Sequence, residues 1–363
     1  MSLSTRLTDL LGCDYPIIQT AMGWVADSKL VAATCNAGGF GFLAGATIPP
    51  QEMEQAILDT KALTDRPFGV NFHMYQSNAR AIIELVIRHG VKAVSYSRSP
   101  GKAMIQQLKT AGVVCIPTVG ALKHAIKAVE MGADAVVVQG GEGGGHTGSV
   151  PTSILLPQVV DALDVPVVGA GGFKDGRGLV AALAYGAEGI AMGTRFLMTK
   201  SSPVPVQTLS RYVEVTNPAK IIVSKAIDGM PQRMITNEFL GKLENAGDWK
   251  RLLMAFRNGL AYRKYTGASI TDLITSALKM RRNDGLTAAQ AIMSANAPMV
   301  IQKAMVDGNP AEGALPAGQI AGAIDNLPTC EALITSIVSE AEECLSQLQR
   351  LHKNKTAAVL SVV

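Results

Sequence analysis

One pattern constrains the fold of this chain more than any other. Up to about residue 200, short apolar runs alternate with longer amphipathic stretches rich in Ala, Leu, Lys and Glu. Eight such runs occur: PIIQT from Pro16, GFGFLA from Gly39, FGVNF from Phe68, KAVSY from Lys92, VVCIP from Val113, DAVVVQ from Asp134, VPVVGA from Val165 and EGIAM from Glu188. Continuous apolar runs are typical of strands buried on both faces, and the stretches between them are typical of crossover helices.

Eight strand–helix units predict an α/β fold of the TIM-barrel, (β/α)8, type. The competing architecture is an open, doubly wound sheet. The spacing of about 20 to 25 residues per unit, without a clear point of sheet reversal, favours the closed barrel. An active site is then expected at the carboxyl ends of the strands.

The alternation of apolar runs and amphipathic stretches ends at about residue 200. We expect residues 201–310 to form a mainly helical cap over the barrel mouth, and residues 1–200 and 311–363 to form the barrel. From Lys200 to Pro310, fifteen Lys and Arg residues stand against eight Asp and Glu residues. This basic cap favours an anionic partner, although solvated helix faces would explain the charge equally well.

Composition excludes several classes of protein. Hydrophobic residues make up 48% of the chain and charged residues 17%, as in a well-cored soluble protein. The sequence shows neither the roughly 20-residue apolar stretch of a membrane span nor a secretion signal, so we expect a cytoplasmic protein. With only 5% aromatic residues, nucleic acid is a weak candidate partner. The cysteine spacing indicates no metal site.

Small or polar residues follow several of the predicted strands, where a barrel places its site. They include Ala170-Gly171-Gly172 after the seventh run and Met192-Gly193-Thr194 after the eighth. Barrels commonly bind phosphate at these two loops, and the dipole of a helix beginning near Lys174 would assist. Alternatively, the glycines only permit tight turns. A third glycine-rich loop after the sixth run favours a binding site.

That third loop, QGGEGGGHTG from Gln139, places His146 among glycines. We predict that His146 faces a ligand as catalytic acid or base. His73, after the third run, is a weaker candidate for the same mouth. Glu142 either orients the loop or caps it. The loop also matches the G-x-G-x-x-G dinucleotide pattern, but no acidic residue ends the next predicted strand, so we discount NAD binding in the Rossmann manner.

In order and spacing, AMGW from Ala21, GVN from Gly69, GGEGGGHTG, GAGGF and MGTRF resemble the nitronate monooxygenase (2-nitropropane dioxygenase) superfamily, which includes flavin-dependent enoyl-ACP reductases. The resemblance spans about residues 5–345 and implies a TIM barrel that holds FMN, with His146 as the catalytic histidine. It assigns cofactor contacts to Ala21, Met22, Asn71, Gln139, Gly144, Gly145, Ala170, Gly171, Gly172, Met192, Gly193, Thr194 and Gln319.

Within that superfamily, VVQGGEGGGHTG, IDGMPQRM from Ile227 and GQIAGAIDNLPTC are similar to a flavin-dependent reductase or dehydrogenase group of bacterial steroid catabolism, which acts on a hydroxylated, methylated hydrindanone carboxylate carried as a CoA thioester. This likeness implies that the cap holds the CoA phosphates, with Lys225, Arg233, Arg257 and Arg263 as unranked candidates. Thr118 stands near where quinone-reducing members carry lysine, which weakens a quinone reductase assignment.

Three functions are therefore compared. The first is an FMN oxidoreductase that reduces or desaturates an activated carbonyl compound such as an acyl-CoA, with NAD(P)H or NAD as a candidate electron partner and a homodimer as a candidate assembly. The second is a nitronate monooxygenase that oxidises alkyl nitronates with O2. The third alternative is either an enoyl-ACP reductase or a flavin-free, phosphate-binding barrel.

Overall fold

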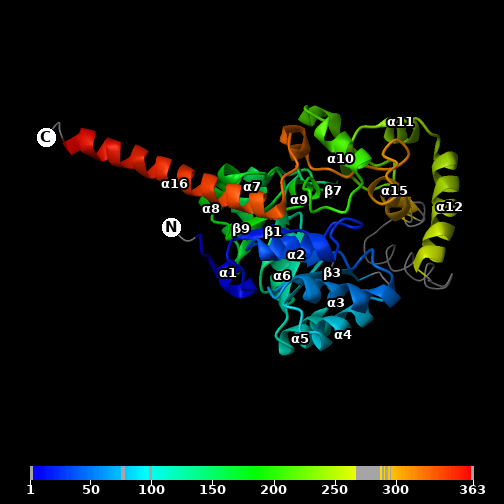
Figure 1. Ribbon diagram of the computed structural model, residues 1–363, viewed down its shortest axis with the longest axis horizontal. Helices are drawn as coiled ribbons and strands as arrows, with labels where there is room; N and C mark the ends of the chain where they lie inside the picture. Colours follow the sequence, from blue (N-terminus) through cyan, green and yellow to red (C-terminus); the bar gives the residue numbers. More distant parts are fainter. Residues whose placement is uncertain are drawn as a thin grey trace.

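A computed structural model gives the structure of the chain (Figure 1). It describes residues 3–74, 78–97, 100–266, 287, 290, 293–294 and 296–360.

Eight parallel strands form a closed barrel, in the order β1-β2-β3-β4-β5-β6-β8-β9. Each of the eight predicted runs coincides with one of them, and the third, fourth and fifth strands extend one or two residues beyond their runs: β1 Ile17–Gln19, β2 Phe40–Leu43, β3 Gly69–His73, β4 Ala93–Ser97, β5 Val114–Val119, β6 Val136–Gln139, β8 Val167–Ala170 and β9 Gly189–Met192. The barrel closes through pairing of β1 with β9, in which Ile18 lies opposite Ala191. The TIM-barrel prediction is confirmed.

The barrel interior is filled by apolar side chains, among them Phe40, Phe42 and Val137. A short helix, α1 (Arg6–Leu11), lies at the amino ends of the strands, where Leu7 and Leu11 are fully buried and Thr5 Oγ1 donates to the carbonyl of Glu188. Because that end of the barrel is packed shut, a site is expected at the carboxyl ends of the strands.

Helices surround the barrel: α2 Ser28–Asn36, α3 Met53–Leu63, α4 Ala79–Arg88, α5 Lys102–Thr110, α6 Leu122–Glu130, α7 Thr152–Val160, α8 Gly176–Ala184, the short α9 Thr194–Leu197 and α16 Cys330–Leu360. The 3-10 turn η1 (Pro50–Glu52) precedes α3. The last helix, α16, packs beside α8 and α2 and then extends away from the body of the molecule (Figure 1).

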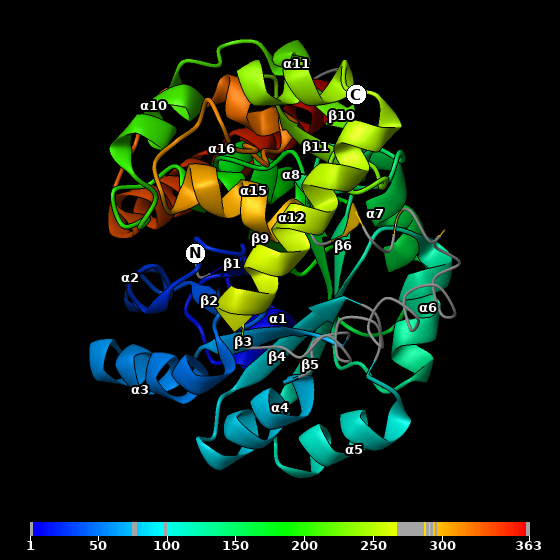
Figure 2. The same cartoon turned by 90° about the vertical axis from the view of Figure 1, so that its right-hand side faces the viewer.

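The region between α9 and α16 forms the cap over the carboxyl ends of the strands (Figure 2). It contains α10 Val206–Val213, η2 Pro218–Lys220, β10 Ile221–Ser224, β11 Gln232–Ile235, α11 Glu238–Glu244, α12 Asp248–Thr266, α15 Asn296–Met305 and η3 Gln319–Ala323. Of the predicted cap residues 201–310, residues 267–286, 288–289, 291–292 and 295 lie outside the described residues.

The cap contains a β-hairpin that the sequence analysis did not predict. Strand β11 pairs with β10 on one side and with β7 (Gly145–His146) on the other, forming a three-stranded sheet. The strand β7 belongs to the glycine-rich loop after β6. The hairpin therefore joins the cap to the barrel at His146, where Gln232 lies directly opposite the histidine.

Candidate active site

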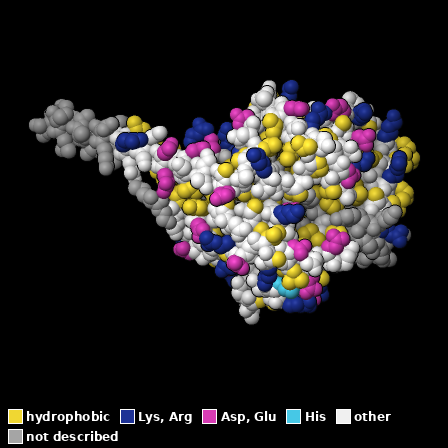
Figure 3. Space-filling model, in the orientation of Figure 1, with side chains coloured by type: hydrophobic (Ala, Val, Ile, Leu, Met, Phe, Trp, Pro, Cys, Tyr) yellow, Lys and Arg dark blue, Asp and Glu magenta, His cyan; other side chains and the backbone are white. Residues whose placement is uncertain are grey.

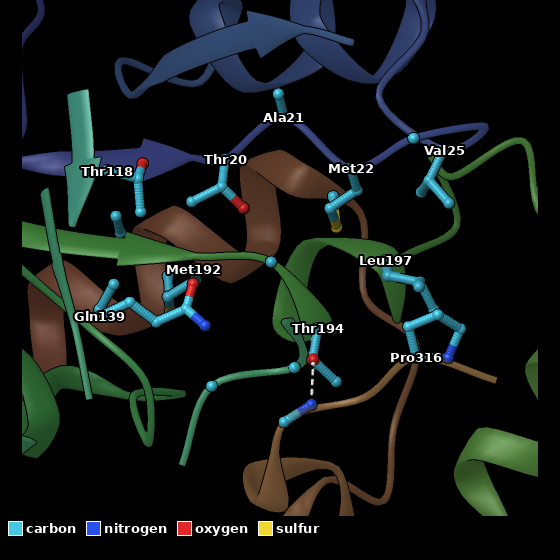
Figure 4. Close-up of a pocket in the computed structure, with 18 of the residues that line it drawn as sticks. Thr20, Ala21, Met22, Val25, Thr118, Gln139, Met192, Thr194, Leu197 and Pro316 are labelled. Carbon is cyan, nitrogen blue, oxygen red and sulfur yellow. Dashed lines mark hydrogen bonds between the residues drawn. The ribbon is translucent and has the colours of Figure 1, made fainter. Parts of the chain in front are cut away.

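A cavity of about 470 Å³ opens at the carboxyl ends of the barrel strands. Its lower walls come from the ends of β1, β3, β6, β8 and β9 and the loops that follow them. Its upper wall includes Ala297, Pro298 and Ile301 of α15. Figure 4 shows residues of this lining, including Gln139, Met192 and Thr194.

The cavity brings together His146 and twelve of the thirteen predicted cofactor contacts. The twelve are Ala21, Met22, Asn71, Gln139, Gly144, Gly145, Ala170, Gly171, Gly172, Met192, Gly193 and Thr194. The thirteenth, Gln319, lies between two residues of the lining, Gly318 and Ile320, and its backbone N–H donates to the carbonyl of Glu142 (2.9 Å). Their roles as cofactor contacts stay predictions.

His146 is held by a buried carboxylate from the cap. Its Nε2 lies 2.7 Å from Asp228 Oδ2, and the Asp228 side chain is only 1% exposed while that of His146 is 53% exposed. An ionised carboxylate can only accept a hydrogen bond, so Nε2 carries the proton. The other ring nitrogen, Nδ1, is then the atom available to accept a proton from a ligand.

Gln232 supports the same arrangement from β11. Its Nε2 lies 2.5 Å from Asp228 Oδ2 and 3.1 Å from His146 Nε2. Because the Nε2 atoms of both residues carry protons, the amide donates to Asp228 alone. The opposite carboxylate oxygen of Asp228 accepts from the backbone N–H of Met230 (3.0 Å). The buried carboxylate of Asp228 thus accepts hydrogen bonds from three donors, in His146, Gln232 and Met230.

Asp228 and Gln232 were not among the site residues predicted from the sequence. Both belong to IDGMPQRM, which carried part of the family resemblance, but no local pattern indicates that they reach His146. Asp228 lies 82 residues from the histidine along the chain. Only the pairing of β11 with β7 brings them together.

Glu142 caps a helix. Its carboxylate accepts hydrogen bonds from the backbone N–H of Thr152 (2.9 Å) and from Thr152 Oγ1 (2.8 Å), at the first residue of α7. The sequence left open whether Glu142 orients the glycine-rich loop or caps it. The contact with Thr152 orients the loop, because it fixes the loop to the start of α7.

Two glycines of the site have no room for a side chain. A Cβ on Gly144 would lie 2.6 Å from the backbone nitrogen of Gly318. Gly171 has a φ of +97°, which an L-residue rarely adopts, and its Cβ would lie 3.1 Å from Thr152 Oγ1. The segment before η3, which carries Gly318, is held at the same place by Thr194, whose Oγ1 accepts from the Gly318 N–H at 2.9 Å (Figure 4).

The helix predicted near Lys174 begins two residues later, as α8 at Gly176. Its first turn is already capped, because Asp175 Oδ1 accepts from the N–H of Gly178 at 3.1 Å. Lys174 and Asp175 line a separate cavity on the side of α16 rather than the one that contains His146. Backbone groups after β8 and β9 are therefore better placed for a phosphate than the α8 terminus is.

None of the five predicted substrate residues lines the His146 cavity. His73, at the end of β3, is half-buried, and Lys225, Arg257 and Arg263 are exposed on the cap. Arg233 is bound within the protein: Nε donates to the Gly141 carbonyl (3.0 Å) and Nη1 to the Ile221 carbonyl (3.1 Å). Burial lowers the pKa of its guanidinium.

The cavity lining suits the FMN that the family resemblance implies. The floor is apolar, with Ile18, Val137 and Ala191, and would accept a flat ring system. The side-chain amides of Asn71 and Gln139 stand at its edge, and glycine backbone after β8 and β9 can approach a phosphate closely. Within the part of the chain that the structure describes, no three His, Cys, Asp or Glu residues cluster as a metal site.

Comparison with known proteins gives a consistent picture. The family model described as nitronate monooxygenase matches residues 4–84 and 73–340. The (3aS,4S,5R,7aS)-5-hydroxy-7a-methyl-1-oxo-octahydro-1H-indene-4-carboxyl-CoA dehydrogenase of Rhodococcus jostii (strain RHA1) is 48% identical over 96% of this chain and 99% of its own length. The protein of the same name from Mycobacterium tuberculosis (strain ATCC 25618 / H37Rv) is 47% identical over 94% of this chain and 97% of its own length.

Among solved structures, FabK from Thermotoga maritima has a TM-score of 0.77 and 30% sequence identity, covering 96% of this chain and 99% of that one. The family model covers most of the chain, including the barrel strands, the His146 loop and much of the cap. The chain therefore belongs to the nitronate monooxygenase family of oxidoreductases.

Proposed function

We propose that this protein is an FMN-dependent oxidoreductase that reduces or desaturates an activated carbonyl compound, a ring carried as a CoA thioester. The observation that carries the proposal is the His146–Asp228 pair, which presents one basic nitrogen to the cavity. The hydroxylated hydrindane thioester in the names of the two relatives supports this substrate class.

Bound FMN would accept a hydride from a ring carbon of the substrate, or return it in the opposite direction. The residues of this chain then have to move one proton. As two neighbouring C–H bonds break and a C=C bond forms, the proton on the carbon next to the thioester carbonyl passes to His146 Nδ1. The negative charge of Asp228 stabilises the imidazolium that results, and the same proton returns in the reverse reaction.

The cap provides exposed positive charge for the CoA part of the substrate. Lys225, Arg257 and Arg263 remain our candidates for its phosphates, since their side chains are free to extend into solvent. Basic side chains are visible over this part of the surface (Figure 3). We assign Arg233 a different role, because its guanidinium already supports the glycine-rich loop at Gly141.

The first test is replacement of His146 by alanine. We expect turnover of the CoA thioester to fall by about 10² to 10⁴-fold, the usual contribution of a general acid–base, while the yellow flavin stays bound. His124→Ala is the matched control, because His124 is exposed on α6 away from the cavity. Unchanged turnover in His146→Ala would contradict the assignment.

The second candidate function, oxidation of alkyl nitronates with O2, is favoured by the match to the nitronate monooxygenase family model. Anaerobic mixing of the protein with each candidate substrate distinguishes the two functions. Flavin bleaching by an alkyl nitronate supports the second function, and bleaching by an acyl-CoA supports the first. Subsequent reoxidation by NAD(P) or by O2 identifies the electron partner. A colourless protein that takes up no FMN would instead favour the flavin-free barrel.

A further inference from the structure

Trp24 has the least expected backbone conformation among the described residues. Its φ is +67°, and it is the one non-glycine residue in the described part of the chain with a positive φ. This left-handed conformation is unfavourable for a bulky L-residue and persists only where surrounding contacts enforce it. Such residues gather at ligand sites, and Trp24 does line the His146 cavity.

Two hydrogen bonds hold Trp24 in place. Its backbone N–H donates to Thr47 Oγ1 (3.0 Å), which fixes the loop after β1 to the loop after β2. Its indole Nε1–H donates to the carbonyl of Pro298 in α15, also at 3.0 Å. The second bond joins the barrel to the cap helix that forms the upper wall of the cavity.

The cavity that Trp24 lines has several apolar side chains on the side of α9 and α15. They are Leu197, Ala297, Ile301 and Met305. These side chains can contact a hydrocarbon ring but offer no hydrogen bond to a polar acyl group. The distance between α15 and the barrel determines how thick a group fits between them, and the indole–Pro298 bond fixes that distance.

We propose that Trp24 is a specificity-determining residue, which holds α15 at the height that accepts an alicyclic acyl group above the cofactor position. The inference rests on the proposed function, because it concerns the acyl part of the same substrate. The acyl group would then be selected by Trp24 on the barrel side as well as by α15, although the two are distant in the sequence.

The test uses the fact that the chain contains only two tryptophans, Trp24 and Trp249. Trp249 is 79% exposed on α12, so Trp249→Phe leaves Trp24 as the only indole fluorophore. We expect the emission of this variant to change on titration with a hydrindane carboxyl-CoA thioester and to stay constant with CoA alone.

Trp24→Phe keeps an aromatic ring and removes the indole donor. We expect the dissociation constant of the ring-bearing thioester to rise about three- to tenfold, as for loss of one hydrogen bond, while that of CoA alone is unchanged. Thr47→Val, which removes the acceptor of the Trp24 backbone N–H and keeps the indole, should shift the same constant in the same direction. If Trp24→Phe does not fold, the dissociation constant measured with Thr47→Val provides the test.

The outcomes distinguish a failure of the proposed Trp24 role from a failure of the proposed function. If wild type, Trp249→Phe and a folded Trp24→Phe bind the ring-bearing thioester equally well, Trp24 does not determine specificity. If wild type binds no CoA thioester but reacts with an alkyl nitronate, the proposed function itself fails. Equal weakening of binding for CoA alone and for the thioester would show a general loss of structure and would also overturn the inference.

Discussion

At the scale of single residues, the protonation of His146 depends on a carboxylate that the cap supplies. In Asp228→Asn, the side-chain amide of the new residue can donate to Nε2, which would move the ring proton to Nδ1 and remove the base. The negative charge that stabilises the imidazolium is also lost. We expect kcat to fall by about 100-fold or more, with little change in flavin content.

Asp307→Asn is the matched control, since Asp307 is exposed on the cap and should have no effect. Nitrogen-15 chemical shifts of the His146 ring report directly which nitrogen carries the proton. A variant with the wild-type tautomer and kcat within twofold of wild type would show that Asp228 has no role in positioning His146.

At the scale of elements, the glycine-rich loop is tightly packed against the segment between α15 and η3. In Gly144→Ala, the added Cβ would meet the backbone of Gly318, which cannot move like a side chain. We expect a loss of about 1–3 kcal/mol in the free energy of unfolding, together with weaker flavin binding. Urea unfolding and the absorbance ratio of flavin to protein measure the two effects.

The control is Gly241→Ala in α11, where a Cβ would meet nothing within 4 Å. Because alanine favours a helix interior over glycine, this variant should gain about 0.5–1 kcal/mol. If Gly144→Ala were as stable as wild type and retained its flavin, the tight packing of this loop would contribute neither to stability nor to flavin binding.

Elements with a local signal were predictable, and contacts between distant elements were not. Each barrel strand is a short apolar run with its own start and stop, so the sequence alone indicated all eight. Hairpin β10–β11 pairs with a two-residue strand of another loop, and its residues give no local sign of that partner. The same reason hid Asp228, while His146 was visible because of its glycine neighbours.

For the whole molecule, the distribution of charge predicts how the CoA part is recognised. Reversal of Arg257 and Arg263 to glutamate removes two exposed cations from the cap. We expect the KM of the CoA thioester to rise about five- to twentyfold at low salt, less at high salt, with kcat nearly unchanged. Steady-state kinetics over a range of ionic strength measure this effect.

The matched control uses a substrate, the pantetheine thioester of the same acyl group, which lacks the nucleotide phosphates. Its KM should be the same for the wild type and the double variant. An equal increase for both thioesters would place the effect in the acyl site or in the fold, and no increase for either would remove Arg257 and Arg263 from the candidates. A homodimeric assembly and a cytoplasmic location stay predictions from the sequence.

The pairing of β11 with β7 has a consequence for how such enzymes diversify. The cap leaves the barrel after α9 and returns before α16, so it could be exchanged between relatives like a module. The exchange would not be neutral, because the hairpin carries the aspartate that orients the barrel's histidine. A recombined enzyme would inherit the upper wall of its cavity and the aspartate that orients His146 from the same donor, in one piece.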